Sequence, residues 1–139
     1  MTLTIHDLME FKRRELDSHS AITQPPPNFL QELKPYMINV QEEAGPHPVE
    51  WDANCEALAA IEILEDVFRV RREKLIALAR DNENPDAAAL LDFETIAWKE
   101  MRHVFEELER SARRAIIPTR PLKTRIIPEL TVTFGGKRL

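Results

Sequence analysis

The sequence predicts an all-α protein: a bundle of about four to five helices with a long antiparallel helix hairpin, followed by a short C-terminal β segment. Three observations lead to this prediction. Only three of the 139 residues are glycine, and none lies between positions 46 and 134. The ten prolines are clustered, so long proline-free stretches remain. Apolar residues make up 43% of the chain, which is enough to bury a core, and they recur at helical spacing.

Two helices are expected in the N-terminal third of the chain. Thr4 should cap the first, because its hydroxyl can accept a backbone hydrogen bond while Asp7 occupies the third helical position. The prolines at 25–27 stop this helix, and Asn28 is expected to cap the next one. Pro35 lies inside the second helix and should kink or restart it, because proline removes one backbone hydrogen bond. The predicted buried stripes are Leu8, Phe11 and Leu16 in the first helix and Phe29, Leu33, Tyr36, Met37 and Val40 in the second.

Two long helices are expected after a breaker at Gly45-Pro46-His47-Pro48. The third helix should run from about Asp52 to Arg80, and its apolar face is wide enough to contact two neighbours. The fourth should run from a cap at Asn84 to about Ala115. Each carries a heptad seam with one charged member. The seams are Ala57, Ile61, Leu64, Phe68, Arg71, Leu75 and Leu78 in the third helix, and Ala87, Leu91, Glu94, Trp98, Met101, Phe105, Leu108, Ala112 and Ala115 in the fourth.

The two seams are expected to face each other, because a short loop makes successive helices antiparallel. Residues whose numbers sum to 165 or 166 then meet, as Phe68 does with Trp98. Arg71 and Glu94 satisfy the same relation. We therefore expect them to form a partly buried ion pair, and the alternative is that each side chain snorkels outward separately.

The third helix also carries a dense basic cluster of Arg69, Arg71, Arg72 and Lys74. Pairing with acidic neighbours one helical turn away is the simplest explanation for such a cluster, and it is favoured for Arg69. For Arg72 and Lys74, this explanation and a role in a packing or partner-binding hub both stay open.

The C-terminal segment has a different pattern from the helices. Residues 124–127 and 130–134 are β-branched and apolar, and Gly135-Gly136 is a turn signal. We therefore predict a helical domain over 1–117, and over 118–139 a linker with the first strand or strands of a truncated small β domain.

The charge of the chain is uneven. Its net charge is −5, but residues 117–139 hold five basic residues against one acidic residue. The acidic body argues against broad binding of duplex DNA, whose affinity comes from phosphate neutralisation. The basic segment is expected to be a solvated linker, and weak DNA contact is the alternative.

The residues that could carry chemistry do not form a predicted catalytic or metal site. Glu100 and His103 have the E-x-x-H spacing of di-iron bundles, but such bundles need two of these motifs. Cys55 is the single cysteine and is read as a small hydrophobe in a reducing compartment. No apolar run can span a bilayer. The sequence therefore predicts an intracellular protein that is not an enzyme and has no metal, cofactor or membrane partner.

Three segments together resemble the GINS family, in the archaeal type that has its helical domain first. The first segment is Gln24-Pro25-Pro26-Pro27-Asn28-Phe29, followed by Leu33 and Tyr36-Met37. The second is the Arg/Lys-rich and Leu-Ala stretch at 68–79, and the third is the Ile-Pro-Glu-Leu and Phe-Gly pattern at 125–135. The resemblance covers about 3–117 well and the tail weakly.

The resemblance implies a non-catalytic scaffold in DNA replication. GINS assemblies bridge the MCM replicative helicase to a Cdc45- or RecJ-like partner and stimulate unwinding, and archaeal versions occur as homotetramers or two-by-two heterotetramers. By position, Pro26, Pro27, Asn28 and Phe29 would fix the second helix. The chain departs from the family in its near lack of the β domain, which contributes partner contacts. A cytoplasmic, nucleoid-associated location in the replisome follows from the same resemblance.

Two other functions stay as alternatives. A helical-bundle metal enzyme predicts bound iron or manganese near His103. A small nucleic-acid-binding module predicts salt-dependent binding that is lost without residues 118–139. The residues expected to form the interface or packing hub are Phe29, Tyr36, Phe68, Arg71, Arg72, Lys74, Leu75, Glu94, Trp98 and Phe105.

Overall fold

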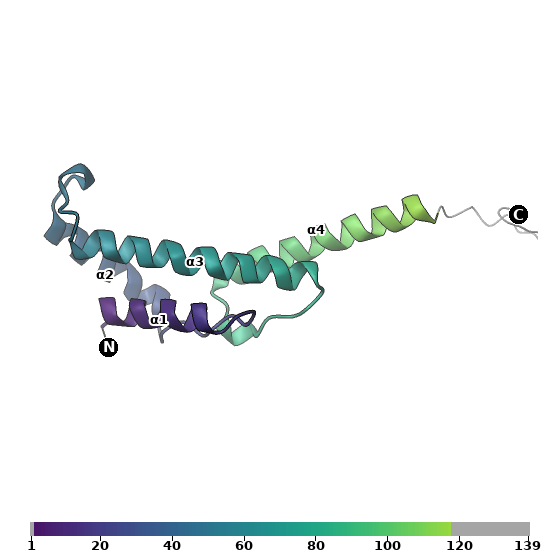
Figure 1. Ribbon diagram of the computed structural model, residues 1–139, viewed down its shortest axis with the longest axis horizontal. Coiled ribbons are helices and arrows are strands. Elements are labelled where there is room, and N and C mark those ends of the chain that lie inside the picture. The colour runs from purple at the N-terminus through teal and green to yellow at the C-terminus, as the bar shows by residue number, and fades with distance from the viewer. Residues whose placement is uncertain (1, 118–139) are drawn as a thin grey trace, which may run out of the picture. The chain divides into compact units, whose positions relative to one another are not determined.

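The computed structural model describes residues 2–117 and is all-helical over that range, which confirms the predicted fold class (Figure 1). The strands expected at 124–134 lie outside the described residues. The four long helices are α1 (Ile5–Asp17), α2 (Phe29–Ala44), α3 (Glu56–Arg80) and α4 (Asp92–Ile116), with short 3-10 helices at Pro48–Glu50 and Ala87–Ala89.

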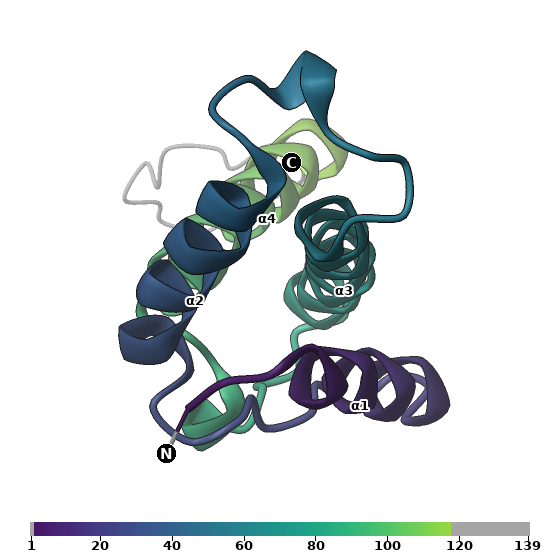
Figure 2. The ribbon, with the colours of Figure 1, turned by 90° about the vertical axis from the view of Figure 1, so that its left-hand side faces the viewer.

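Helix α3 is the centre of the fold, and α1 and α2 pack on two sides of it (Figure 2). This arrangement confirms the prediction that its wide apolar face contacts two neighbours. Three rings link the layers: Phe11 meets Phe29 with centroids 5.4 Å apart, and Phe29 meets Phe68 at 6.4 Å. The buried core is Leu3, Leu8, Phe11, Phe29, Tyr36, Val40, Ala57, Ala60, Leu64, Val67 and Leu91.

The start of α1 confirms the predicted cap. The Thr4 hydroxyl accepts from the Asp7 backbone N–H at 3.3 Å, and the Asp7 carboxylate accepts from the Thr4 N–H at 2.9 Å. Two of the N–H groups that a helix start leaves unpaired are satisfied in this way. Leu8 and Phe11 are fully buried as predicted, whereas Leu16 is 52% exposed.

Replacing Thr4 with alanine is expected to lower the free energy of unfolding by about 1 kcal/mol, because the Asp7 N–H loses its acceptor. Urea denaturation followed by circular dichroism measures this loss. Thr2→Ala is the matched control, since Thr2 is exposed and lies before the helix. An equal loss in both variants would contradict the role of the cap.

Asn28 stands at the N-cap position of α2 as predicted, but its side chain makes no capping hydrogen bond. Its backbone is in the left-handed region with φ of 54°, whereas a side-chain cap needs extended backbone at this position. Pro35 lies within α2, which continues to Ala44 without a restart.

Both later helices begin beyond their predicted starts. Asp52 accepts from the Asn54 N–H at 3.0 Å, and this local turn competes with helix formation, so α3 begins only at Glu56. Asn84 does not cap α4. The Asp86 carboxylate instead accepts from the Ala88 N–H and caps the 3-10 helix at Ala87–Ala89.

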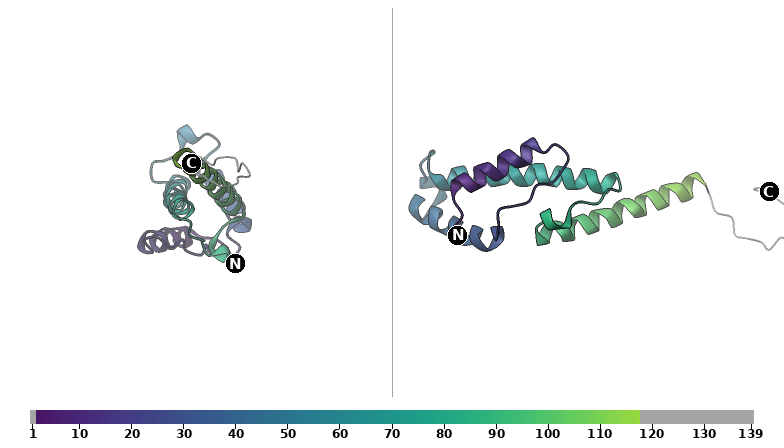
Figure 3. Two further views of the ribbon diagram at one scale, coloured as in Figure 1. Left: turned by 90° about the vertical axis from the view of Figure 1, so that its right-hand side faces the viewer. Right: turned by 90° about the horizontal axis from the view of Figure 1, so that it is seen from below.

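The predicted antiparallel pairing of the third and fourth helices is wrong for the first turns of α4. Phe68 contacts Phe93 with ring centroids 5.9 Å apart, and the Arg102 guanidinium donates to the Ala79 carbonyl at 2.6 Å. Partner numbers therefore rise together along both helices, which is the signature of parallel direction. The segment between Arg80 and Asp92 runs back along α3 before α4 begins (Figure 3, right). This connection is longer than the short loop on which the antiparallel prediction depended.

The chain divides into two units within α4, Met1–Arg102 and His103–Leu139. Of the second unit, the structure describes 103–117, which continue α4 to Ile116. The predicted division at residue 117 lies at the edge of the described residues and stays a prediction. Within the described range, no helix has the length and apolar character needed to cross a bilayer.

Candidate functional site

Arg71 and Glu94 form a buried ion pair, as the sequence hypothesis required. The guanidinium Nε and Nη2 donate to the two Glu94 carboxylate oxygens at 2.8 and 2.6 Å, which is the strong bidentate geometry. Arg71 is completely buried and Glu94 is 5% exposed. The remaining Arg71 N–H groups donate to the Glu15 carboxylate and to the backbone carbonyls of Thr23 and Ala89. All five guanidinium donors therefore have an acceptor.

Lys74 and Glu15 extend this cluster to α1. The Lys74 ammonium donates to a Glu15 carboxylate oxygen at 2.6 Å, and also to the Glu15 carbonyl, the Ser18 hydroxyl and the Ala21 carbonyl. Glu15 is completely buried and Lys74 is 7% exposed. We call the four residues Glu15, Arg71, Lys74 and Glu94 the ionic hub. It ties together the end of α1, the turn after it, α3 and the start of α4.

The ionic hub holds two cations and two anions, so its formal charge is zero. Burial by itself raises the pKa of Glu15, but hydrogen bonds from Lys74, Thr23 and Arg71 outweigh this and hold the pKa below its ordinary value. Burial lowers the pKa of Arg71, and the carboxylates of Glu94 and Glu15 more than offset it, so the pKa is raised. The charged groups of the ionic hub pair with one another. These pairs hold the helices in fixed positions.

The predicted site residues fall into three groups. Phe29, Tyr36 and Leu75 are buried in packing, and the Tyr36 hydroxyl donates to Glu56 at 2.6 Å. Arg71, Lys74 and Glu94 belong to the ionic hub. The others are exposed or half-buried: Phe68, Arg72, Trp98 and Phe105. Arg69 pairs with Asp66 at 2.7 Å, as its simplest explanation predicted.

Sequence reasoning missed Glu15 and Phe93. Glu15 follows Leu8 and Phe11 by helical steps on the buried face of α1, a charged residue in an apolar stripe just as Arg71 is in α3. That signal was present in the sequence. Phe93 lies between two acidic residues at the start of α4 and is 50% exposed. Its role comes from its contact with Phe68 of α3, which the local sequence does not indicate.

An apolar groove lies between α3 and the first turns of α4, with a volume of about 930 Å³. Phe68 and Phe93 meet in it with ring centroids 5.9 Å apart. Glu65, Arg69 and Arg72 supply its charged rim. The full lining is Ile61, Leu64, Glu65, Phe68, Arg69, Arg72, Leu75, Ile76, Phe93, Glu94, Ala97 and Met101. Exposed apolar surface with a polar rim is typical of a protein-binding site.

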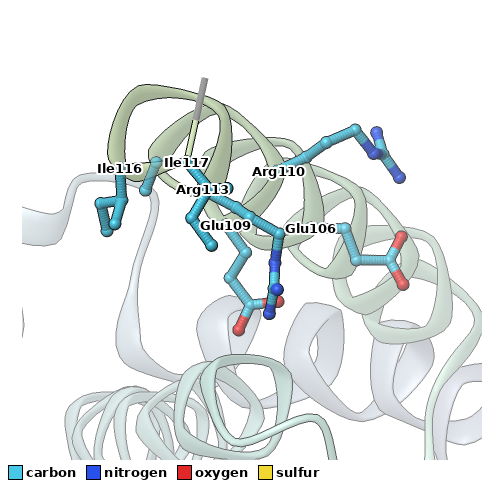
Figure 4. Close-up of a pocket in the computed structure, with 7 residues that line it drawn as sticks. Glu106, Glu109, Arg110, Arg113, Ile116 and Ile117 are labelled. Carbon is cyan, nitrogen blue, oxygen red and sulfur yellow. The ribbon is translucent and has the colours of Figure 1, made fainter. Parts of the chain in front are cut away.

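A second hollow lies on the last turns of α4, where Figure 4 shows its charged side chains. Glu109 and Arg113 point the same way, one helical turn apart, and Glu106 precedes Arg110 by the same spacing. An acid that lies one turn before a base stabilises a solvated helix surface. This hollow also contains Ala112, Ile116 and Ile117 but is formed by α4 and Ile117 alone, whereas the groove has two walls that Arg71 and Glu94 join, so the groove is the better candidate site.

The candidates for metal or nucleophilic chemistry lie apart from each other. Glu100 and His103 are exposed on α4, and Cys55 is half-buried next to the first turn of α3. Within residues 2–117, the structure brings together no group of three or more His, Cys, Asp or Glu side chains that could hold a metal ion.

Comparisons of the chain with protein-family models, with curated proteins and with solved structures give no match.

Proposed function

We propose that this chain is a non-catalytic scaffold subunit of a GINS-like replication assembly in the replisome. In this proposal it forms a homo- or heterotetramer with sister subunits and links the MCM helicase to a Cdc45- or RecJ-like protein. The rigid helical body presents binding faces, and none of its steps involves covalent chemistry.

The observation that carries this proposal is the apolar groove between α3 and α4. Phe93 is half-exposed and Ile76 is 37% exposed at its wall. Covering such side chains releases about 25 cal/mol for each Å² of apolar surface removed from water. The rim at Glu65, Arg69 and Arg72 can set the orientation of a bound protein, because rim charges act on register more than on affinity.

The ionic hub supports a scaffold function in a second way. A binding face is useful only if its two walls are held in a fixed relation, and here the walls are α3 and the start of α4. Arg71 and Glu94 join these walls directly by two hydrogen bonds. The sequence resemblance names the partner class, and the segments at 24–37 and 68–79 that carry it lie at the start of α2 and along α3.

The test is retention of an MCM ring and a RecJ-like protein from the same organism by the tagged full-length chain. The variant Ala97→Lys extends the small Ala97 side chain into a long one and places its ammonium at the apolar groove. We expect binding of at least one partner to fall by about tenfold or more, since a buried unpaired charge is costly. Co-purification and surface plasmon resonance measure the change.

Ile96→Lys is the matched control. Ile96 is the preceding residue on α4, is 61% exposed and does not line the groove. We expect this variant to bind as the wild type does. Failure of the wild-type chain to retain either partner would overturn the proposed function, and equal loss in both variants would remove the groove from it.

A further inference from the structure

The second unit presents an apolar stripe on α4. Val104, Leu108 and Ala115 follow one another by helical steps, and Val104 and Leu108 are 61% and 63% exposed. Phe105 and Ala112 widen the stripe on one flank. A helix is stabilised in a protein chiefly by burial of its apolar face, so a partner that covers this stripe would stabilise the end of α4.

The charges of this segment select the occupant that can cover the stripe. Its first half carries Glu107 and Glu109, and its second half carries Arg110, Arg113 and Arg114. A parallel copy would place acid beside acid and base beside base. An antiparallel copy places the acidic half of each chain beside the basic half of the other, which is favourable.

We propose that residues 103–117 pair antiparallel with the same residues of a second copy of this chain. Val104 of each copy then lies opposite Ala115 of the other, and Leu108 lies opposite Ser111. In this register Glu107 of one copy faces Arg114 of the other, and the two-fold axis makes this contact twice. Such an interface is self-complementary, as a symmetric dimer requires.

The ion pair that Glu107 makes within its own helix still allows a contact with Arg114 of a second copy. Glu107 pairs with Arg110 of its own helix, and the side chains are 46% and 56% exposed. An exposed pair of this kind contributes little to stability. The Glu107 carboxylate has a second oxygen that can accept from Arg114 of the other copy, since a carboxylate offers several acceptor positions.

This inference rests on the proposed scaffold function for its biological meaning, because it names the first partner in the assembly as another copy of the chain. The experiments below measure only the self-association of the chain. A monomeric chain that still retains the MCM ring would overturn the self-pairing and leave the scaffold function standing. A dimer that retains neither partner would support the self-pairing and overturn the scaffold function.

The first experiment is sedimentation equilibrium of the full-length chain at micromolar concentration. We expect a dimer or a higher even-numbered state for the wild type. Glu107→Arg should weaken association about tenfold or more, because it sets Arg beside Arg twice. The swap Glu107→Arg with Arg114→Glu should restore association, since the opposite charges face each other again. A monomeric wild type, or a swap as weak as the single variant, would overturn the proposal.

The second experiment tests direction by disulfide crosslinking in a Cys55→Ser background, where serine suits the position before the first turn of α3. A disulfide needs Cα atoms within about 7 Å. A mixture of Val104→Cys and Ala115→Cys chains should crosslink to each other, while Val104→Cys alone should not. Self-crosslinking of Val104→Cys would mean a parallel pair and would overturn the register.

Discussion

Replacement of Arg71 with alanine is expected to lower the free energy of unfolding by about 3–5 kcal/mol, the typical effect of removing one partner from a buried ion pair. Glu15 and Glu94 would each keep a buried carboxylate with a cationic partner lost, and the carbonyls of Thr23 and Ala89 would lose a donor. Urea denaturation of the full-length chain, followed by far-ultraviolet circular dichroism, measures the change. A loss of this size is large for a single substitution.

Arg72→Ala is the matched control for this experiment. Arg72 is the next residue on the same helix, has the same helix propensity and is exposed, so its loss should change stability by less than about 0.5 kcal/mol. Arg71→Lys should fall between the two, because an ammonium keeps the charge but offers three donors in place of five. Similar losses for Arg71→Ala and Arg72→Ala would contradict the hub.

The sequence located the Arg71–Glu94 contact although it assigned the wrong direction to α4. One contact fixes a point at which two helices meet, and both a parallel and an antiparallel pair can pass through that point. Direction needs a second contact, such as Phe68 with Phe93. The heptad seams do not distinguish the two directions, because the spacing of apolar residues along a helix is the same in both directions of the chain.

The starts of the helices show a second limit of prediction from the sequence, because some of them depend on distant residues. Thr4 and Asp7 form the predicted cap because that motif needs only residues three positions apart. The late start of α3 depends on the turn at Asp52, and the start of α4 depends on Glu94. The Glu94 carboxylate accepts from the Leu91 N–H at 3.0 Å, and its position for this bond is set by Arg71, which is far away in the sequence.

Glu15 was predictable, and the reason is physical. A charged residue within an apolar stripe is stable only if an opposite charge is buried with it. The stripe of α1 ends on Glu15, the seam of α3 contains Arg71, and the seam of α4 contains Glu94. This requirement, which predicts the pairing of Arg71 with Glu94, also predicts a buried cation beside Glu15. Lys74, from the basic cluster of α3, is that cation.

Replacement of Glu15 with glutamine is expected to destabilise the protein by about 3 kcal/mol or more at pH 7, because Arg71 and Lys74 lose a shared buried anion. The loss should shrink in acid. The pKa of Glu15 is held below its ordinary value of 4.5 in the folded state. Its carboxylate therefore contributes stability that is fully present above pH 4.5 and is lost as the pH falls through the folded pKa.

The measurement is urea denaturation of the wild type and of Glu15→Gln at several pH values from 7 to 3. We expect the difference between the two to be constant down to about pH 5 and to narrow below the ordinary pKa of a glutamate. Glu10→Gln is the control on the same helix, since Glu10 pairs with Arg13 at the surface and such pairs add little. A difference for Glu15→Gln that stays constant to pH 3 would mean that the pKa of Glu15 is the same in the folded and the unfolded protein. The charge of Glu15 would then contribute nothing to the stability of the folded protein, and its structural role in the ionic hub would have to be abandoned.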